Sequence, residues 1–483
     1  MWAMTASRRS ASRGVATSNR LSLPVVAAFG STAAPIAAIG LVMGVYLPRF
    51  FSTYIGLGLS AVGAAFMIVR LLDMGLDPLL GMAMDRTRTR LGRYRPWLIL
   101  GAPITMLAIY MLFMAQPGLS FAGLLLWLLV LYSGVSILTL GQAAWGATLA
   151  TDYHDRSRVY GVVQAVGVIG AILILLLPLA LTGKPSGAHG GVPAMGWFLI
   201  GLLPLTVVLC ALITPEKISP RADNETPVTL QDYWSLLTRP EVLRLVWADF
   251  IIALGPGTTA ALYLFFFHDA RQYTLPQTSI LLLFYIAAGL VGSLFWGAVA
   301  QRIGKHRAIM ASSVAYAVAQ TALMIIPPAT MSLAIPGMFF VGFVGSAFAP
   351  IVRAMVADVA DEVRLETGHE RTGLLYALIT TAEKVGAAIT VGISFKVLEI
   401  VGYKAAEGAV NTPQAIHGLE MTYVFAPITL VFLGGAAFIG WKLDAERHGE
   451  VRRQLDIRDA LAAEARTFEA ATGVSIASPP DRP

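Results

Sequence analysis

Hydrophobic segments of about 20 residues or more recur along almost the whole chain, and short polar segments separate them. Each apolar segment is long enough to cross a bilayer as a helix. We predict spans at 22–47, 57–84, 98–116, 121–150, 159–183, 193–213, 241–267, 277–301, 308–328, 331–358, 372–399 and 421–442. The pattern therefore predicts an all-α membrane protein with twelve transmembrane helices.

The polar segments divide these spans into two halves. The longest internal polar segment, Thr214 to Trp234, follows the sixth span. We predict a tail at 1–21, a six-helix bundle at 22–213, a central loop at 214–240, a second six-helix bundle at 241–442 and a tail at 443–483. The last tail has the periodicity and mixed charge of a surface helix.

Two pairs of loops repeat at one spacing. "MDRTRTRLGRYR" after the second span has a shorter counterpart in "QRIGKHR" after the eighth, and "TDYHDRSRVYG" after the fourth resembles "ADEVRLETGHERTG" after the tenth. Equal offsets at two places favour an internal repeat, as in the parallel six-plus-six plan of major facilitator transporters.

Composition supports a membrane protein. Of the 483 residues 56% are hydrophobic and 13% are charged, about half the usual share of charge. Arginines and lysines gather in the loops after spans 2, 4, 8 and 10, which predicts that both termini are cytoplasmic. We expect an integral protein of a bacterial-type cytoplasmic (inner) membrane. The single cysteine, Cys210, excludes a disulfide framework.

The charged loops suggest gating pairs or lipid anchoring. The candidates are Asp85, Arg90, Arg93, Arg95, Asp152 and Arg156. The arginine-rich loop is short and close to the membrane, so we expect no nucleic-acid partner. The sequence contains no phosphate-binding loop, nucleophile elbow or zinc-protease motif, so we expect neither an enzyme nor an ATP-driven pump.

Two carboxylates interrupt the second span. Asp73 and Asp77 are four residues apart and Arg70 precedes Asp73 by three, so all three share one helix face. Such residues in a bilayer face water or a partner and mark functional sites. The pair can share a Na⁺, or one member can hold a proton. The alternative is that both acids only pair with Arg70 or with a lysine elsewhere.

Lys384 in the eleventh span is the natural long-range partner for these acids. The adjacent Glu383 points about 100° away on a helix, so we expect it to face another helix or Arg353. Asp249, near the start of the seventh span, is interpreted as interfacial. Lys384 is also a candidate for binding a solute, and the alternative for it is a lysine that snorkels from a helix end. Weaker candidates for binding a solute are Thr139, Gln142, Trp145, Gln164 and Tyr263, for which helix–helix hydrogen bonding is the alternative.

Three motifs resemble signatures of the glycoside–pentoside–hexuronide:cation symporters, the melibiose permease group of the major facilitator superfamily. They are "RLLDMGLDPLLGMAMDRTRTRLGRYRPW", "ATDYHDRSRV" and "MVADVADEVRLETGHERTGLLYALITTAEKVG". The resemblance covers most of the chain and implies alternating access and cation-coupled uptake. It also implies that Asp73 and Asp77 hold the coupling cation, that Lys384 lies beside it, and that the Ser136 hydroxyl helps to bind it.

The chain departs from this family at informative positions. Sodium-selective members place an asparagine just before the second aspartate, where this chain has Leu76. One oxygen ligand is absent, so both Na⁺ and H⁺ stay open as coupling ions. Melibiose permeases bind galactosides through acids in spans 1 and 4 and an arginine in span 5. Here span 1 is uncharged, and the other positions are Thr139 and Gln164.

The resulting hypothesis is a Na⁺- or H⁺-coupled symporter for a sugar or glycoside-like small solute. The alternatives are a cation-coupled transporter of an amphiphile such as a lysophospholipid, and a non-transporting sensor or membrane enzyme. We expect no cofactor, a lipid bilayer around the protein, and a monomer. If the ion is Na⁺, Asp73 and Asp77 are its ligands.

Overall fold

The computed structural model describes residues 21–149, 153–181, 191–216, 230–369 and 371–472. Within these residues the regular structure is helical, and twelve helices or helix runs are long and apolar enough to cross a membrane. The predicted fold class is confirmed. The elements of the first half are α1 (Leu23–Ser31), α2 (Ala33–Leu41), η1 (Val42–Tyr46), α3 (Leu47–Arg49), η2 (Phe50–Tyr54), α4 (Leu59–Arg86), α5 (Arg95–Phe113), α6 (Phe121–Leu149), α7 (Tyr153–Ala180) and α8 (Val192–Ile213).

The second half follows after the short helix α9 (Leu230–Leu237), which lies in the predicted central loop. Its elements are α10 (Pro240–Leu264), η4 (Phe265–Ala270), α11 (Leu275–Ile303), α12 (Lys305–Ile325), α13 (Met331–Gly345), α14 (Phe348–Thr367), α15 (Thr372–Ile400) and α16 (Pro413–Ala436). The predicted surface helix in the last tail is confirmed as α17 (Ala445–Thr472).

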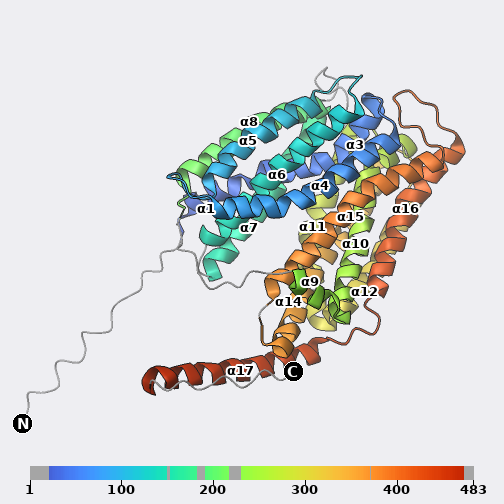
Figure 1. The fold of residues 1–483 in the computed structure, drawn as a ribbon. Coiled ribbons are helices and arrows are strands. Elements are labelled where there is room, and N and C mark those ends of the chain that lie inside the picture. Colours follow the sequence, from blue (N-terminus) through green and yellow to red (C-terminus); the bar gives the residue numbers. More distant parts are fainter. Residues whose placement is uncertain (1–20, 150–152, 182–190, 217–229, 370, 473–483) are drawn as a thin grey trace, which may run out of the picture.

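The spans form two bundles, α1–α8 and α10–α16 (Figure 1). The bundles converge beside α3 and α16 and diverge toward the side of α17. We call the end that carries residue 21, α9 and α17 the tail end, and the opposite end the far end. Helices α4 and α15 make the most extensive contact between the bundles.

Two glycines allow this close contact near the far end. A Cβ atom on Gly63 of α4 would lie 3.2 Å from the Cα atom of Gly392 on α15 and 3.1 Å from the Cβ atom of Phe395. These distances are tighter than ordinary side-chain packing. Glycine is therefore required where the two backbones approach, and the contact fixes the far halves of α4 and α15 against each other.

The first span is longer than the sequence predicted. It runs from Leu23 to Tyr54, seven residues beyond the predicted end. The helix continues past Pro48 and Arg49 through the π-helical turns η1 and η2. Proline has no amide hydrogen to donate, so regular α-helical hydrogen bonding is interrupted at Pro48, and the π-helical turns flank this position. Arg49 itself is buried, because a partner on the other bundle compensates its charge.

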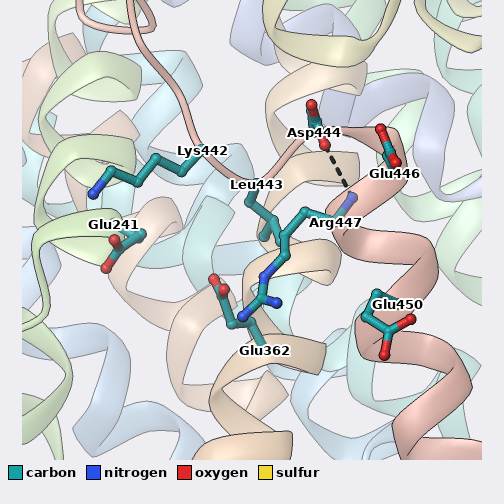
Figure 2. Close-up of a pocket in the computed structure, with 8 residues that line it drawn as sticks. All are labelled: Glu241, Glu362, Lys442, Leu443, Asp444, Glu446, Arg447 and Glu450. Atoms are coloured by element: carbon teal, nitrogen blue, oxygen red, sulfur yellow. Dashed lines mark hydrogen bonds between the residues drawn. The ribbon is translucent and has the colours of Figure 1, made fainter.

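Ion pairs attach α17 to the tail end of the second bundle. Arg364 NH2 lies 3.0 Å from Asp459 Oδ2, and His448 Nε2 lies 3.0 Å from Asp361 Oδ2. A hollow of about 640 Å³ lies beside this contact, lined in part by Glu362, Lys442 and Arg447 (Figure 2). Figure 2 shows the Arg447 side chain directed toward Glu362. The residues that line the hollow are distant in sequence from Asp73 and Asp77 of α4, and neither acid lines it.

Candidate functional site

Helix α4 positions the two acids on one face at mid-length. Asp73 is fully buried, and it accepts a hydrogen bond of 2.9 Å from Ser136 Oγ of α6 at its Oδ1 atom. Its Oδ2 atom lies 3.4 Å from Arg70 NH1, one turn earlier on α4. The Arg70 guanidinium in turn lies over the Tyr132 ring at 5.1 Å. Asp73 therefore has both a donor and a counter-charge inside its own bundle.

Asp77 obtains its counter-charge from the other bundle. Lys384 Nζ of α15 donates to Asp77 Oδ2 and forms an ion pair with it. The Asp77 and Lys384 side chains are 14% and 26% exposed, so the pair is partly solvated. Asp77 Oδ1 is buried and has no hydrogen-bond partner among the described residues. The structure thus brings together all four residues predicted for the cation site: Asp73, Asp77, Ser136 and Lys384.

These residues offer the oxygen atoms that a small hard cation prefers. Both carboxylates and the Ser136 hydroxyl are available, and the unpartnered Oδ1 of Asp77 has capacity for another ligand. Leu76, which precedes Asp77, is half-buried and adds no oxygen. A proton on Asp77 requires fewer ligands than a metal ion, so the donor set is compatible with H⁺ and sparse for Na⁺.

The candidate solute-binding residues fall into two groups. Thr139 on α6 and Gln164 on α7 are exposed. Gln142, Trp145 and Tyr263 are buried, and each makes a hydrogen bond inside its own bundle. Gln142 Nε2 donates to Thr32 Oγ1 at 2.6 Å, Trp145 Nε1 to the Pro215 carbonyl at 3.3 Å, and Tyr263 Oη to the Thr278 carbonyl at 2.7 Å. The second group therefore supports the packing of the helices, and the solute-binding role of the first group stays a prediction.

The charged loop after α4 folds around an acid that the sequence analysis did not single out. Glu216 follows α8, and its Oε1 atom accepts the backbone N–H groups of Arg93 at 2.6 Å and Tyr94 at 2.7 Å. Gly92 precedes them with φ +118°, a conformation that favours glycine, and a Cβ there would overlap the Glu216 carboxylate. A carboxylate at the start of α5 is stabilised by the helix dipole.

The other predicted loop residues are placed less completely. Arg95 NH2 donates to the Thr214 carbonyl at 2.8 Å, so this arginine joins the loop to the end of α8. Arg90 is exposed. Asp152 lies outside the described residues, and Asp85 and Arg156 belong to α4 and α7 with side chains that are not described. The gating role of these residues stays a prediction.

A second charged contact joins the two bundles at the far end. Arg49 NH2 of α3 lies 2.7 Å from Asp269 Oδ1 of η4, which also lies 2.6 Å from His268 Nδ1. Tyr403 Oη donates to Asp269 Oδ2 at 2.6 Å. Burial and the Asp269 carboxylate raise the pKa of the Tyr403 phenol, so the phenol stays protonated and donates this bond. We call Arg49, His268, Asp269 and Tyr403 the far-end latch.

Sequence reasoning missed the far-end latch because each member looks interfacial when considered alone. Arg49 and Asp269 are 220 residues apart, and no local periodicity relates them. A signal was available in the comparison of the two halves, since both residues lie at the far end of the first span of a bundle. Tyr46 of η1 reinforces the contact, with its hydroxyl 2.9 Å from Ser279 Oγ of α11.

The structure thus consists of two helical bundles. An ion pair joins them at mid-depth, and the far-end latch closes one end. This arrangement is that of a membrane transporter of the major facilitator type. The family described as MFS/sugar transport protein matches residues 28–445, and the chain belongs to this family. The resemblance to glycoside–pentoside–hexuronide:cation symporters is thereby supported, and the protein is a transporter and not an enzyme.

Relatives and solved structures agree with this assignment. The chain is 25% identical to the uncharacterized symporter YnaJ of Bacillus subtilis over 86% of this chain and 91% of that protein. It is 26% identical to the isoprimeverose transporter of Lactiplantibacillus pentosus over 83% and 84%, respectively. The crystal structure of a mutant of the nucleoside transporter NupG is 13% identical and has a TM-score of 0.69 over 86% of this chain and all of that chain, which shows the shared fold.

Proposed function

We propose that the protein is a cation-coupled symporter that takes up a sugar or glycoside-like small solute by alternating access. The observation that carries this proposal is the ion pair between Asp77 of one bundle and Lys384 of the other, with one Asp77 oxygen buried and unpartnered among the described residues. Relatives named for isoprimeverose, lactose and raffinose support a sugar as solute.

In this mechanism Lys384 and the coupling cation compete for Asp77. The ammonium group neutralises the carboxylate across the two bundles, and Na⁺ or H⁺ bound at Asp77 would remove the need for it. Asp73 stays compensated by Arg70 and Ser136 throughout, because all three belong to the first bundle. Cation binding would then break the ion pair between Asp77 and Lys384, which is one of the charged contacts between the bundles.

We expect the solute to bind between the bundles, near Thr139 and Gln164, because these two polar residues are exposed on α6 and α7. Their hydroxyl and amide groups can donate to and accept from sugar hydroxyls. Neither carries charge, so a neutral solute fits better than an anion. The alternative, an amphiphile such as a lysophospholipid, is retained as an arm of the test.

The basic loops favour a cytoplasmic location for the tail end. The far-end latch is closed and the bundles diverge toward the tail end (Figure 1). We therefore infer a state that is open to the cytoplasm. Coupled transport of the solute and the cation then requires the far-end latch to open in the other half of the transport cycle.

Transport by proteoliposomes under imposed Na⁺ or H⁺ gradients tests the proposal. Sugars and lysophospholipids form the two solute panels, and a gradient is expected to drive accumulation of a sugar. Asp77→Asn should abolish this accumulation, because an amide neither titrates nor binds a cation strongly. Exchange of labelled for unlabelled solute should persist, since exchange needs no net coupling.

Asp459→Asn is the matched control, because it makes the same chemical change in an ion pair on the surface helix α17. It should leave accumulation unchanged. Concentrative uptake by Asp77→Asn at the wild-type level would overturn the cation-site assignment. Accumulation of lysophospholipids alone would overturn the sugar assignment and leave the coupling site standing.

A further inference from the structure

A third intramembrane acid lies outside the Asp73–Asp77 site. Asp249 of α10 was interpreted as interfacial, but α10 begins at Pro240 and Asp249 lies more than two turns inside it. It is 4% exposed, and its Oδ2 atom is buried without a hydrogen-bond partner among the described residues. A buried carboxylate oxygen without a donor is costly, so its environment must supply a compensating charge or a proton.

The neighbouring helix α15 places a second acid at the same level. Gly386 of α15 packs closely on α10, where a Cβ atom would lie 3.4 Å from the Phe250 carbonyl oxygen. Glu383 precedes Gly386 by one turn, and Asp249 precedes Phe250 by one residue. Asp249 interacts electrostatically with Glu383 and with Arg353 of α14. Asp249 and Glu383 therefore lie at the same level of the packed helices α10 and α15.

The cations near this pair do not balance its charge. Arg353 NH2 lies 3.4 Å from Glu383 Oε2, which confirms the predicted partner of Glu383, but the Arg353 side chain is 59% exposed. Lys384, the next residue on α15, pairs with Asp77. Two carboxylates thus share one solvated guanidinium group.

Arg244 of α10 and the charged groups of α16 have partners elsewhere, and Glu241 of α10 and Glu362 of α14 line the hollow beside α17. Arg244 on α10 donates to the carbonyl groups of Ala437 and Ile439 at the tail end. On α16, Glu420 forms an ion pair with Arg271 at the far end, and His417 lies 3.8 Å from the same carboxylate. These partners leave Asp249 with Glu383 and Arg353 as the charged groups that act on it.

We propose that Asp249 and Glu383 share one proton and form a second proton-binding site, located in the C-terminal bundle. A proton removes the excess negative charge at this level of the bundle, and either carboxyl group can carry it. Two carboxylates that share a site do not both ionise without a large electrostatic cost. The site takes H⁺ as its ligand and shares no residue with the Asp73–Asp77 site.

The helix α15 links this site to the pair at Asp77. Glu383 and Lys384 are consecutive, so a movement of α15 within its own bundle, relative to both α4 and α10, would displace Lys384 from Asp77 and Glu383 from Asp249. Protonation of the second site would therefore depend on the position of α15. This inference requires neither the identity of the solute nor the coupling role of Asp77.

Infrared difference spectra of the purified full-length protein, recorded in H₂O and in D₂O at neutral pH, test the shared proton. A protonated carboxyl group has a C=O band that a carboxylate lacks, and the band shifts on deuteration. We expect Asp249→Asn to remove one such band. Glu383→Gln should remove or shift the same band, because it removes the negative charge that acts on Asp249.

Asp459→Asn and Asp77→Asn serve as controls and should leave that band in place. The Glu383 side chain is 27% exposed, so Glu383→Gln should fold even if Asp249→Asn does not. A spectrum that neither variant changes would overturn the proposal, as would a band that disappears only in Asp77→Asn. No solute or gradient is used, so failure of the symport proposal would leave this measurement interpretable.

Discussion

Replacing Arg49 by glutamine should open the far end of the transporter. Arg49 and Asp269 belong to different bundles, and their side chains are 5% and 21% exposed in the latched state. When the far end opens, the two groups separate and each gains access to water. The substitution therefore raises the free energy of the latched state and has little effect on the free energy of the open state.

The expected magnitude follows from the burial of the pair. Removing one partner of a buried ion pair costs about 3–5 kcal/mol, because the remaining charge is left uncompensated. Asp269 is partly solvated and keeps the donor Tyr403, so we expect about 2–3 kcal/mol, which changes the ratio of open to latched molecules by about 30- to 150-fold.

Distances between two spin labels report the far end directly. Gln116, in the loop after α5, and Val410, which is 90% exposed in the loop after α15, lie at the far ends of different bundles. Cysteines at these positions carry the labels, in a background where the single native cysteine, Cys210, is replaced by serine. Double electron–electron resonance should show a longer-distance population that grows in Arg49→Gln.

Arg271→Gln is the matched control. Arg271 is also a buried arginine at the far end, but its partner Glu420, at 3.3 Å, belongs to the same bundle. This variant should lower the thermal stability of the protein and leave the distance distribution unchanged. If Arg49→Gln gives the wild-type distribution, the far-end latch does not hold the bundles together and the reasoning fails.

Two further substitutions test the cation site. Ser136→Ala removes the hydroxyl donor to buried Asp73 and should weaken the apparent cation affinity in solute counterflow by about 10- to 30-fold, whereas Ser133→Ala, one turn away on α6, should not. Leu76→Asn adds an amide oxygen beside Asp77 and should increase the stimulation of uptake by Na⁺ relative to H⁺. An unchanged response to Na⁺ would show that position 76 does not select the ion.

Local spacing was enough to predict much of the geometry around Asp73 and Asp77. The interval of four residues places Asp73 and Asp77 on one helix face, and the interval of three adds Arg70, so the geometry within α4 follows from helical periodicity. The separate partners of the two acids did not follow from it. Which acid meets Arg70 and which meets Lys384 depends on how α4 and α15 pack, and the close approach of Gly63 and Gly392 fixes that packing.

The predicted ends of two spans are wrong at places where tertiary structure compensates a charged side chain. The first and tenth spans were predicted to end at residues 47 and 358, yet the helices continue past Arg49 and Asp358 to Tyr54 and Thr367. In each case a distant partner neutralises the charge, namely Asp269 for Arg49 and Lys305 for Asp358 at 2.6 Å. Hydropathy is a local property, so it cannot detect a counter-charge that lies far away in the sequence.

The different partners of Asp73 and Asp77 have a mechanical consequence. Asp73 has its hydrogen-bond donor and its ion-pair partner within one bundle, and Lys384 of the other bundle acts on it only at longer range. The charge of Asp77 is compensated only while Lys384 stays close, which holds α15 against α4. If a cation neutralises Asp77, the ion pair at mid-depth is lost while the far-end latch remains. Coupling in this protein would therefore depend on two charged contacts in series, of which only the one at Asp77 responds to the ion.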